Sequence, residues 1–177
     1  INSTKFFVEQ LEYELTAAGL IAGCTSLMID HICVRLSEAG DVEKLHQEII
    51  ETGYGQNIST AIVSGRKIHI LKLHHPIQIG PWSTYCIELP YPKPGHLYGD
   101  GWEHVEFVLP SAPTVQGIAD AFTSMFPGCS EPYEVKVPSV DSDQLPNPSV
   151  DLVLDGVGVK FHPYSIEEVV GHTKPSR

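Results

Sequence analysis

The sequence predicts an α+β protein built from two tandem βαβββ units, and three observations support this fold class. Strand and helix patterns follow one another in the same order twice along the chain. A short strand motif occurs once in each half, at 30–34 (DHICV) and at 103–107 (EHVEF). The length of 177 residues suits one domain, or two small halves that share a core. An internal repeat constrains the fold more than either half does alone.

Apolar residues at helical spacing mark the helices of the first half, and runs with a period of two mark its strands. The expected elements are, in order, an opening helix at 4–20, a strand at 27–36, a helix at 39–53, a hairpin of strands at 58–63 and 67–73, a proline-rich linker at 76–81 and a strand at 84–89. After the opening helix the order is therefore strand, helix and three strands.

The second half repeats this order. The expected elements are a strand at 102–109, a helix at 113–126, a short strand at 133–137, a polar loop at 138–149, a tight hairpin of strands at 151–154 and 157–162, and a short helix at 166–170. We therefore expect an N-terminal helix region at 1–25, a first module at 26–94 and a second at 95–177, in one compact domain.

Composition narrows the class of function. The formal net charge is −11 and no stripe of Lys or Arg occurs, which disfavours nucleic-acid binding. No stretch approaches the roughly 20 apolar residues of a membrane-spanning helix. The four cysteines show no CxxC spacing, which favours free thiols and a cytoplasmic location. The sequence is compatible with a monomer and with a homodimer.

The duplicated motif places a histidine at the same position of two predicted strands. Successive side chains of a strand point to opposite faces, so His31, Cys33 and Arg35 share one face of the first strand. His104 and Glu106 share the equivalent face of the second strand. The opposite faces are wholly apolar, which suits packing on a helix. This matched parity predicts that the two imidazoles converge on one metal ion.

A third ligand is predicted on the strand at 84–89. Glu88 lies there in an otherwise apolar stretch, where a buried carboxylate is costly without a partner. Two histidines and one carboxylate leave coordination positions open, as in catalytic Zn²⁺ and non-haem Fe²⁺ sites.

A fourth ligand is harder to place, because the repeat is imperfect at its end. Glu88 follows His31 by 57 residues, and the same step from His104 reaches Phe161. The neighbouring His162 can donate a lone pair, but it is one position out of phase. A bulge or a one-residue insertion in the preceding hairpin would bring His162 into the site.

Other charged residues are candidates for catalysis and for anion binding. Arg35 is predicted to orient an anionic group of the substrate. Glu106 is predicted as a general base or as a further ligand. Arg66 and Lys72 lie in the turn and the second strand of the hairpin at 58–73, where solvated residues are the competing interpretation. His69 lies on a predicted strand, and the sequence does not fix the face to which its side chain points. The remaining histidines are predicted on the surface or in loops: His46, His74, His75, His96 and His172.

Several segments resemble the bacterial YecM family, over about residues 5–171. The more specific ones are GWEH at 101–104 and KFHP followed by SIEE, within 160–168. The other segments are Asp30-His31, Gly65-Arg66, Lys72-Leu73-His74 and Glu88-Leu89-Pro90.

That family is similar in fold to the vicinal oxygen chelate superfamily, which includes glyoxalase I and the extradiol dioxygenases. The resemblance implies an incomplete, cup-shaped mixed barrel with its helices outside and a divalent metal (Zn, Fe, Ni or Mn) inside. By position, His31, Glu88 and His104 match the ligand places of the superfamily. Phe161 or His162 stands at the fourth place, where the superfamily often has Glu.

Three functions are compatible with these residues. The first is a metal-dependent isomerase, lyase or dioxygenase that acts on a small oxyanion or vicinal-oxygen substrate. The second is a non-catalytic binding module with the same cup. The third is a structural pair of modules in which His31 and His104 are hydrogen-bonded core residues.

Overall fold

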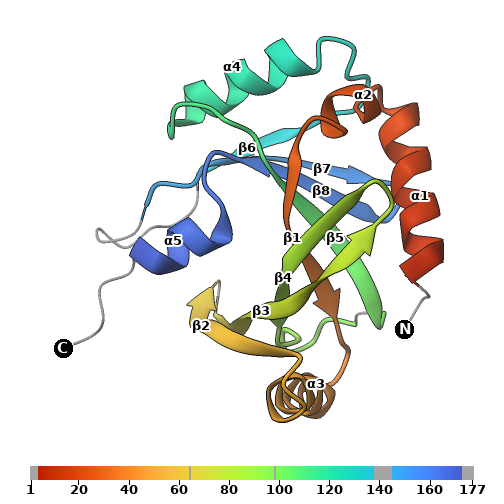
Figure 1. Cartoon of the computed structure of the whole chain (residues 1–177). Helices are drawn as coiled ribbons and strands as arrows, with labels where there is room; N and C mark the ends of the chain where they lie inside the picture. Colours follow the sequence, from red (N-terminus) through yellow and green to blue (C-terminus); the bar gives the residue numbers. More distant parts are fainter. Residues whose placement is uncertain (1–3, 64, 98, 138–144, 173–177) are drawn as a thin grey trace.

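The computed structural model describes residues 4–63, 65–97, 99–137 and 145–172, which form one eight-stranded sheet with helices around it (Figure 1). The helices are α1 (Thr4–Ala17), α2 (Ile21–Cys24), α3 (Ala39–Glu51), α4 (Val115–Met125) and α5 (Ile166–His172). The strands are β1 (Met28–Arg35), β2 (Gly55–Val63), β3 (Arg66–Ile79), β4 (Trp82–Pro90), β5 (Gly101–Val108), β6 (Glu134–Lys136), β7 (Ser149–Leu154) and β8 (Val157–His162).

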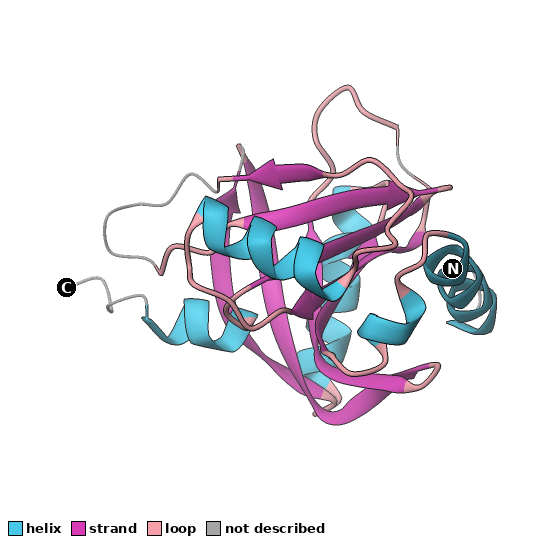
Figure 2. Ribbon diagram, turned by 90° about the horizontal axis from the view of Figure 1, so that it is seen from above, coloured by secondary structure: helices cyan, strands magenta, loops and turns pink. Residues whose placement is uncertain are grey.

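The two halves of the chain join along the strands that carry the duplicated motif. The strand order is β2-β3-β4-β1-β5-β8-β7-β6, with β1 antiparallel to β5. Each of these strands is also parallel to the last strand of its own half, β4 or β8. The sheet curves without closing, and Figure 2 shows helices lying across its strands. The predicted fold class, an incomplete mixed barrel with helices outside, is confirmed.

One face of the sheet forms the hydrophobic core beneath the helices. Apolar side chains of β1, β5 and β8 point there, and Ile32, Phe107 and Phe161 are fully buried. The Phe161 ring stacks on Phe107 at 5.5 Å and meets Phe122 of α4 at 5.3 Å. Full burial of such a ring contributes about 1.5–3 kcal/mol. Phe161 therefore packs in the core and not at the predicted fourth ligand place.

The expected proline-rich linker at 76–81 is wrong, because β3 continues through it to Ile79. The register between β3 and β4 shifts between Lys72 and Ile77, and this irregularity accommodates Pro76, which has no N–H to donate. Gly80, with a φ of 58°, then makes the tight turn into β4. A long hairpin thus replaces the linker.

The opening helix and the polar loop of the second half also differ from expectation. The single opening helix at 4–20 is two helices, because the chain turns at Gly19, where φ is 75°. The polar loop at 138–149 lies partly outside the described residues, and its last residue already belongs to β7. In the described parts of the chain, no helix has the length and apolar character needed to cross a bilayer.

Candidate metal centre

Strand register lines up the site residues in two rows that run across the concave face of the sheet. In the first row, His31 on β1 stands opposite Glu106 on β5, and Glu106 stands opposite Lys160 on β8. The row brings an imidazole, a carboxylate and an ammonium group from three neighbouring strands side by side.

The second row alternates large polar residues with small ones. Glu88 on β4 stands opposite Cys33 on β1, which stands opposite His104 on β5 and then Gly158 on β8. A Cβ atom added to Gly158 would lie 2.7 Å from the Cβ of His104, so only glycine leaves this histidine its place. The small residues make room for Glu88 and His104 to lean towards the first row.

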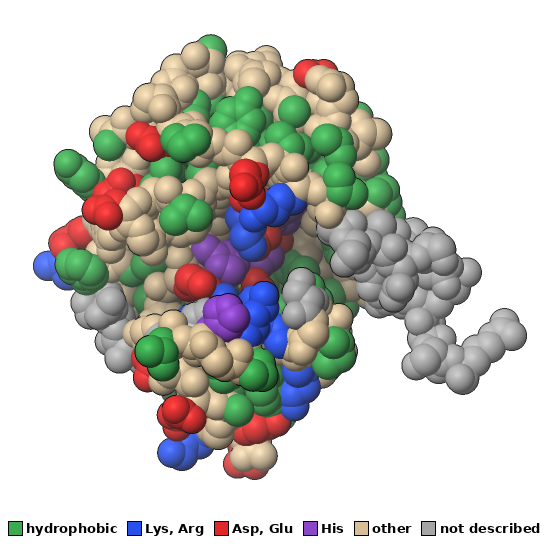
Figure 3. Space-filling view, turned by 180° about the vertical axis from the view of Figure 1, so that it is seen from behind, with side chains coloured by type: hydrophobic (Ala, Val, Ile, Leu, Met, Phe, Trp, Pro, Cys, Tyr) green, Lys and Arg blue, Asp and Glu red, His purple; other side chains and the backbone are tan. Residues whose placement is uncertain are grey.

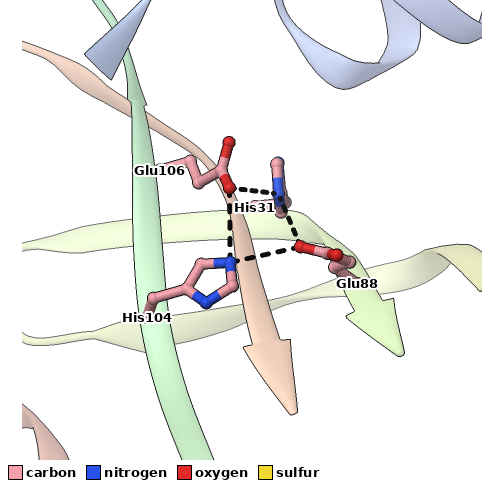
Figure 4. Close-up of side chains that lie close together, drawn as sticks. All are labelled: His31, Glu88, His104 and Glu106. Carbon is pink, nitrogen blue, oxygen red and sulfur yellow. Dashed lines mark hydrogen bonds and ion pairs between the residues drawn. The ribbon is translucent and has the colours of Figure 1, made fainter. Parts of the chain in front are cut away.

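Four donor atoms meet between the two rows, as Figure 4 shows. The Nε2 atom of His31 lies 3.5 Å from Oε2 of Glu88 and 3.5 Å from Oε1 of Glu106. The Nε2 atom of His104 lies 3.1 and 3.2 Å from the same two oxygens. All four atoms lie within 4.8 Å of one another. Their side chains are 4–12% exposed.

This spacing fits a divalent ion. Ligands about 2.0–2.2 Å from a tetrahedral centre stand about 3.3–3.6 Å apart, and octahedral neighbours stand about 3 Å apart. The measured separations of 3.1–3.5 Å fall in this range. Two imidazole nitrogens and two carboxylate oxygens are also a donor set that Zn²⁺, Fe²⁺, Ni²⁺ and Mn²⁺ accept.

Each histidine is held by the acidic residue that precedes it in the duplicated motif. The Nδ1 of His31 contacts Asp30 at 2.7 Å, and the Nδ1 of His104 lies 3.4 Å from Glu103. The register between β1 and β5 shifts once beside Asp30 and again beside Glu103. These bulges turn each acid towards its histidine instead of the opposite face. Such partners fix the tautomer and leave Nε2 free for a metal.

The two orienting acids are themselves held in place. The Asp30 carboxylate accepts hydrogen bonds from the backbone N–H of Ile166, at the start of α5. Glu103 accepts a hydrogen bond from the buried guanidinium of Arg35. Burial opposes the ionisation of Glu103, but His104 and Arg35 outweigh it and lower its pKa to about 2. Arg35, predicted to orient a substrate anion, thus contacts the residue that orients His104.

The two histidines and the two carboxylates shift one another's pKa values. Burial alone would lower the pKa of His31, but Glu106, Asp30 and Glu88 raise it well above the ordinary value. The pKa of His104 is raised in the same way, against burial, by neighbouring Cys33, Glu103 and Glu106. The histidines in turn hold the pKa values of Glu88 and Glu106 below their usual range, although burial acts the other way. The histidines and the carboxylates therefore each favour the charged form of the other.

Lys160 is the residue that sequence reasoning missed. In the first half, the residue two positions after His31 pairs with Glu88. In the second half, the residue two positions after His104 pairs with Lys160, which therefore occupies the place that Glu88 has in the first half. Its Nζ donates to Oε1 of Glu106 at 2.5 Å and lies 3.4 Å from Nε2 of His104. The step from His104 is 56 residues and not 57, a difference that the sequence alone does not reveal.

His162 lies on the same face as Lys160, two residues further along β8. Its Nε2 is 3.2 Å from Oε2 of Glu106 and 3.6 Å from Asp30, while its Nδ1 contacts the backbone carbonyl of Tyr164 at 2.5 Å. It groups with Asp30 and His31 and not with the four donors. The structure therefore places the predicted fourth ligand behind Glu106, against the carboxylate oxygen that faces away from the donor group.

Two other histidines lie on the far side of the sheet. His69 points under α3, where its ring stacks on His46 at 4.1 Å. His46 was expected on the surface, but it shares the inner face of α3 with Val42 and Ile49, four residues before it and three after. Its spacing from these apolar residues was the signal for a partly buried position.

His46 and His69 form a second donor group with Glu43, but its geometry suits a metal less well. The rings are nearly parallel, with 15° between their planes, so their lone pairs point alongside each other and not to one centre. The Glu43 carboxylate accepts hydrogen bonds from Lys67 at 2.9 Å and from Tyr91, as Glu106 in the cup accepts one from Lys160, so the orientation of the rings is what separates the two groups. The donor group in the cup is therefore the better candidate for a metal centre among the described residues.

The chain matches one protein family over almost its whole length. The family model described as "YecM protein" matches residues 1–172. Protein YecM of Escherichia coli K12 is 34% identical over 151 residues, which are 82% of this chain and 78% of that protein. A Haemophilus influenzae protein is 30% identical over 154 residues, covering 82% of this chain and 80% of its own length.

Solved structures agree with the fold. A chain described as "Structural Genomics, Protein EC4020" has a TM-score of 0.80 and 32% identity, over 97% of this chain and 89% of its own. A Streptomyces coelicolor methylmalonyl-CoA epimerase variant in complex with 2-nitronate-propionyl-CoA has a TM-score of 0.52 at 17% identity, over 77% and 94%. These epimerases have the vicinal oxygen chelate fold, which is therefore the fold of this chain as well.

Proposed function

This chain belongs to the YecM family, and from that premise we propose that it binds one divalent metal ion in its cup and acts there on a small oxygen-bearing substrate. One observation carries the proposal. Four donor atoms from β4, β1 and β5 meet at separations of 3.1–3.5 Å, and each histidine among them has an acidic partner at its other nitrogen. We propose His31, Glu88, His104 and Glu106 as the ligands.

Glu106 suits the role of a ligand better than that of a general base. A general base works best with a pKa near the operating pH. His31 and Lys160 hold the pKa of Glu106 well below its usual range, against the effect of burial. Its Oε1 also faces both histidines. His162 was predicted as the fourth ligand, but it contacts the other oxygen of Glu106, and we propose that it supports this ligand instead of binding the metal.

The surrounding residues define what the site can do with a substrate. A bound divalent ion would supply Lewis acidity, which stabilises negative charge on a substrate oxygen. Lys160 holds a proton at Nζ beside Glu106 and His104, where it can donate a hydrogen bond to such an oxygen. Arg35 keeps Glu103 in place and so orients His104. The likeness to an epimerase supports isomerase chemistry as the first reaction to test, ahead of lyase and dioxygenase chemistry.

The first expected result is one metal ion per chain. Protein freed of metal with a chelator is titrated with Zn²⁺, Ni²⁺, Mn²⁺ and, without oxygen, Fe²⁺, by calorimetry and by metal analysis after dialysis. We expect one equivalent of at least one of these ions to remain bound. Retention of less than a tenth of an equivalent of every ion would contradict the proposal.

The second expected result concerns the orientation of His31. The exchange Asp30→Asn removes the charge that holds Nδ1 of this histidine but keeps the size of the side chain. Loss of such a partner costs about 10–100-fold in metal affinity. Calorimetric titration with the ion retained by the unmodified protein measures the change. The control is Asp41→Asn, on the exposed side of α3, and equal affinities of the two variants would show that Asp30 does not position the ligand.

A metal-free binding module is the second candidate function, and Lys160 is the observation that favours it. Its ammonium group already compensates Glu106 without any ion. This alternative predicts that small anions bind equally well before and after treatment with a chelator. The enzyme hypothesis predicts turnover only with metal, and loss of that turnover in Glu88→Ala.

A further inference from the structure

A cavity of about 320 Å³ opens beside the donor group, on the side of the second half. Figure 3 shows the hollow, in which histidine, acidic and basic side chains gather. Its wall includes His104 and Lys160, so the cavity reaches the donor group directly. This volume is at the lower end of the range for ligand sites, which indicates a small ligand.

Cationic side chains dominate the charged wall of this cavity, although the whole chain carries a net charge of −11. They are Arg35, Arg66, Lys136 and Lys160, against the carboxylates Glu103 and Asp151. A cleft of one sign in a protein of the other sign concentrates ligands of opposite charge. The cavity is therefore suited to an anion.

Three of the four cations already have a carboxylate partner within the protein. Arg35 pairs with Glu103, Lys160 with Glu106, and Lys136 with Asp151 at 2.9 Å. Arg66, at the start of β3, has no ion-pair partner among the residues that the structure describes. A partly buried guanidinium on a cavity wall without a partner is well placed to bind a carboxylate in a bidentate manner.

The charges at the inner end of the cavity, where it meets the proposed metal ligands, also favour an anionic ligand. A divalent ion would offset the charges of its proposed carboxylate ligands Glu88 and Glu106, which leaves the positive charge of Lys160 on the cavity wall. Arg66 supplies a second positive charge on the same cavity wall. Two positive charges on the wall of one cavity match a ligand with two negative groups.

We infer that the cavity binds a small dianion, with one carboxylate on Arg66 and an oxygen-bearing anionic group over the metal ligands. This inference rests on the proposed function for its inner end, whereas its outer end rests on Arg66 alone. It narrows the substrate class from any vicinal-oxygen compound to short compounds with a carboxylate at one end.

The test is a titration of metal-loaded protein with oxalate, malonate, succinate and glutarate, and with acetate and inorganic phosphate for comparison. Metal content is measured after each titration, so that loss of the ion to the ligand is detected. We expect at least one dicarboxylate to bind at least tenfold more tightly than acetate. In Arg66→Ala this dicarboxylate should bind at least tenfold more weakly, with metal affinity unchanged.

Two further variants separate geometry from charge. Arg66→Lys keeps the charge but not the planar fork, and we expect an intermediate affinity. Lys44→Gln removes one positive charge from the exposed side of α3 and should leave dicarboxylate binding unchanged. If no dicarboxylate binds more tightly than acetate, or if Arg66→Ala has no effect, the inference is wrong.

The remaining outcomes distinguish the two ends of the site. Phosphate binding as tight as that of the best dicarboxylate, with the same dependence on Arg66, would mean a simple anion site and overturn the two-ended ligand. Absence of metal uptake in the unmodified protein would overturn the proposed function and the inner end. The same titration on metal-free protein then tests Arg66 separately, and a tenfold loss in Arg66→Ala would retain its carboxylate contact.

Discussion

The exchange His104→Ala will lower the affinity for the divalent ion at least 100-fold. His104 contributes one of the four donor atoms, and its Nε2 lies closer to both carboxylate oxygens, at 3.1 and 3.2 Å, than the Nε2 of His31 does, at 3.5 Å. Without it, Glu88 and Glu106 also lose a cationic neighbour that holds them in the cup. Calorimetric titration of the chelator-treated variant measures the loss, and thermal unfolding without metal shows whether the variant folds.

The matched control for this exchange is His46→Ala. His46 belongs to the second donor group, on the other side of the sheet, and it also contacts another histidine. We expect its metal affinity to stay within threefold of that of the unmodified protein. If His46→Ala loses the ion and His104→Ala retains it, the metal centre lies under α3 and not in the cup. The volume-preserving His104→Gln repeats the test should His104→Ala fail to fold.

Much of the fold could be predicted because its physical signals are local. The period of two in β1 and β5 separates an apolar face from a polar one, and the same separation recurs in both halves. That parity placed His31, His104 and Glu106 on one face without knowledge of the pairing. Glu88 followed from the cost of burying a carboxylate in an apolar strand.

What could not be predicted depends on irregularities in strand pairing. Strict alternation would put Asp30 and Glu103 on the apolar side, but bulges turn both towards the histidines. The position of Lys160 depends on a repeat that is one residue shorter in the second half, and Phe161 consequently faces the core. Such shifts arise from long-range pairing, and a single sequence carries no local signal for them.

The exchange Gly158→Ala will destabilise the protein and weaken metal binding together. Alanine is ordinarily favoured over glycine within a strand, by roughly 0.5–1 kcal/mol. Here the added Cβ would lie 2.7 Å from the Cβ of His104. Both atoms are attached directly to paired backbones, so the strands themselves must move apart. Overpacking of this kind costs about 1–3 kcal/mol, which exceeds the intrinsic preference for alanine.

The effect on the metal follows from the same contact. His104 can relieve the clash only by moving away from Gly158, and its Nε2 then leaves the position between Glu88 and Glu106. We expect a loss of at least tenfold in metal affinity, together with a lower unfolding temperature without metal. Gly40→Ala is the control, because its Cβ would meet open space in α3, and it should be as stable as the unmodified protein or slightly more stable. A Gly158→Ala variant with unchanged stability and affinity would show that β5 and β8 separate easily, and that the position of His104 does not depend on a glycine opposite it.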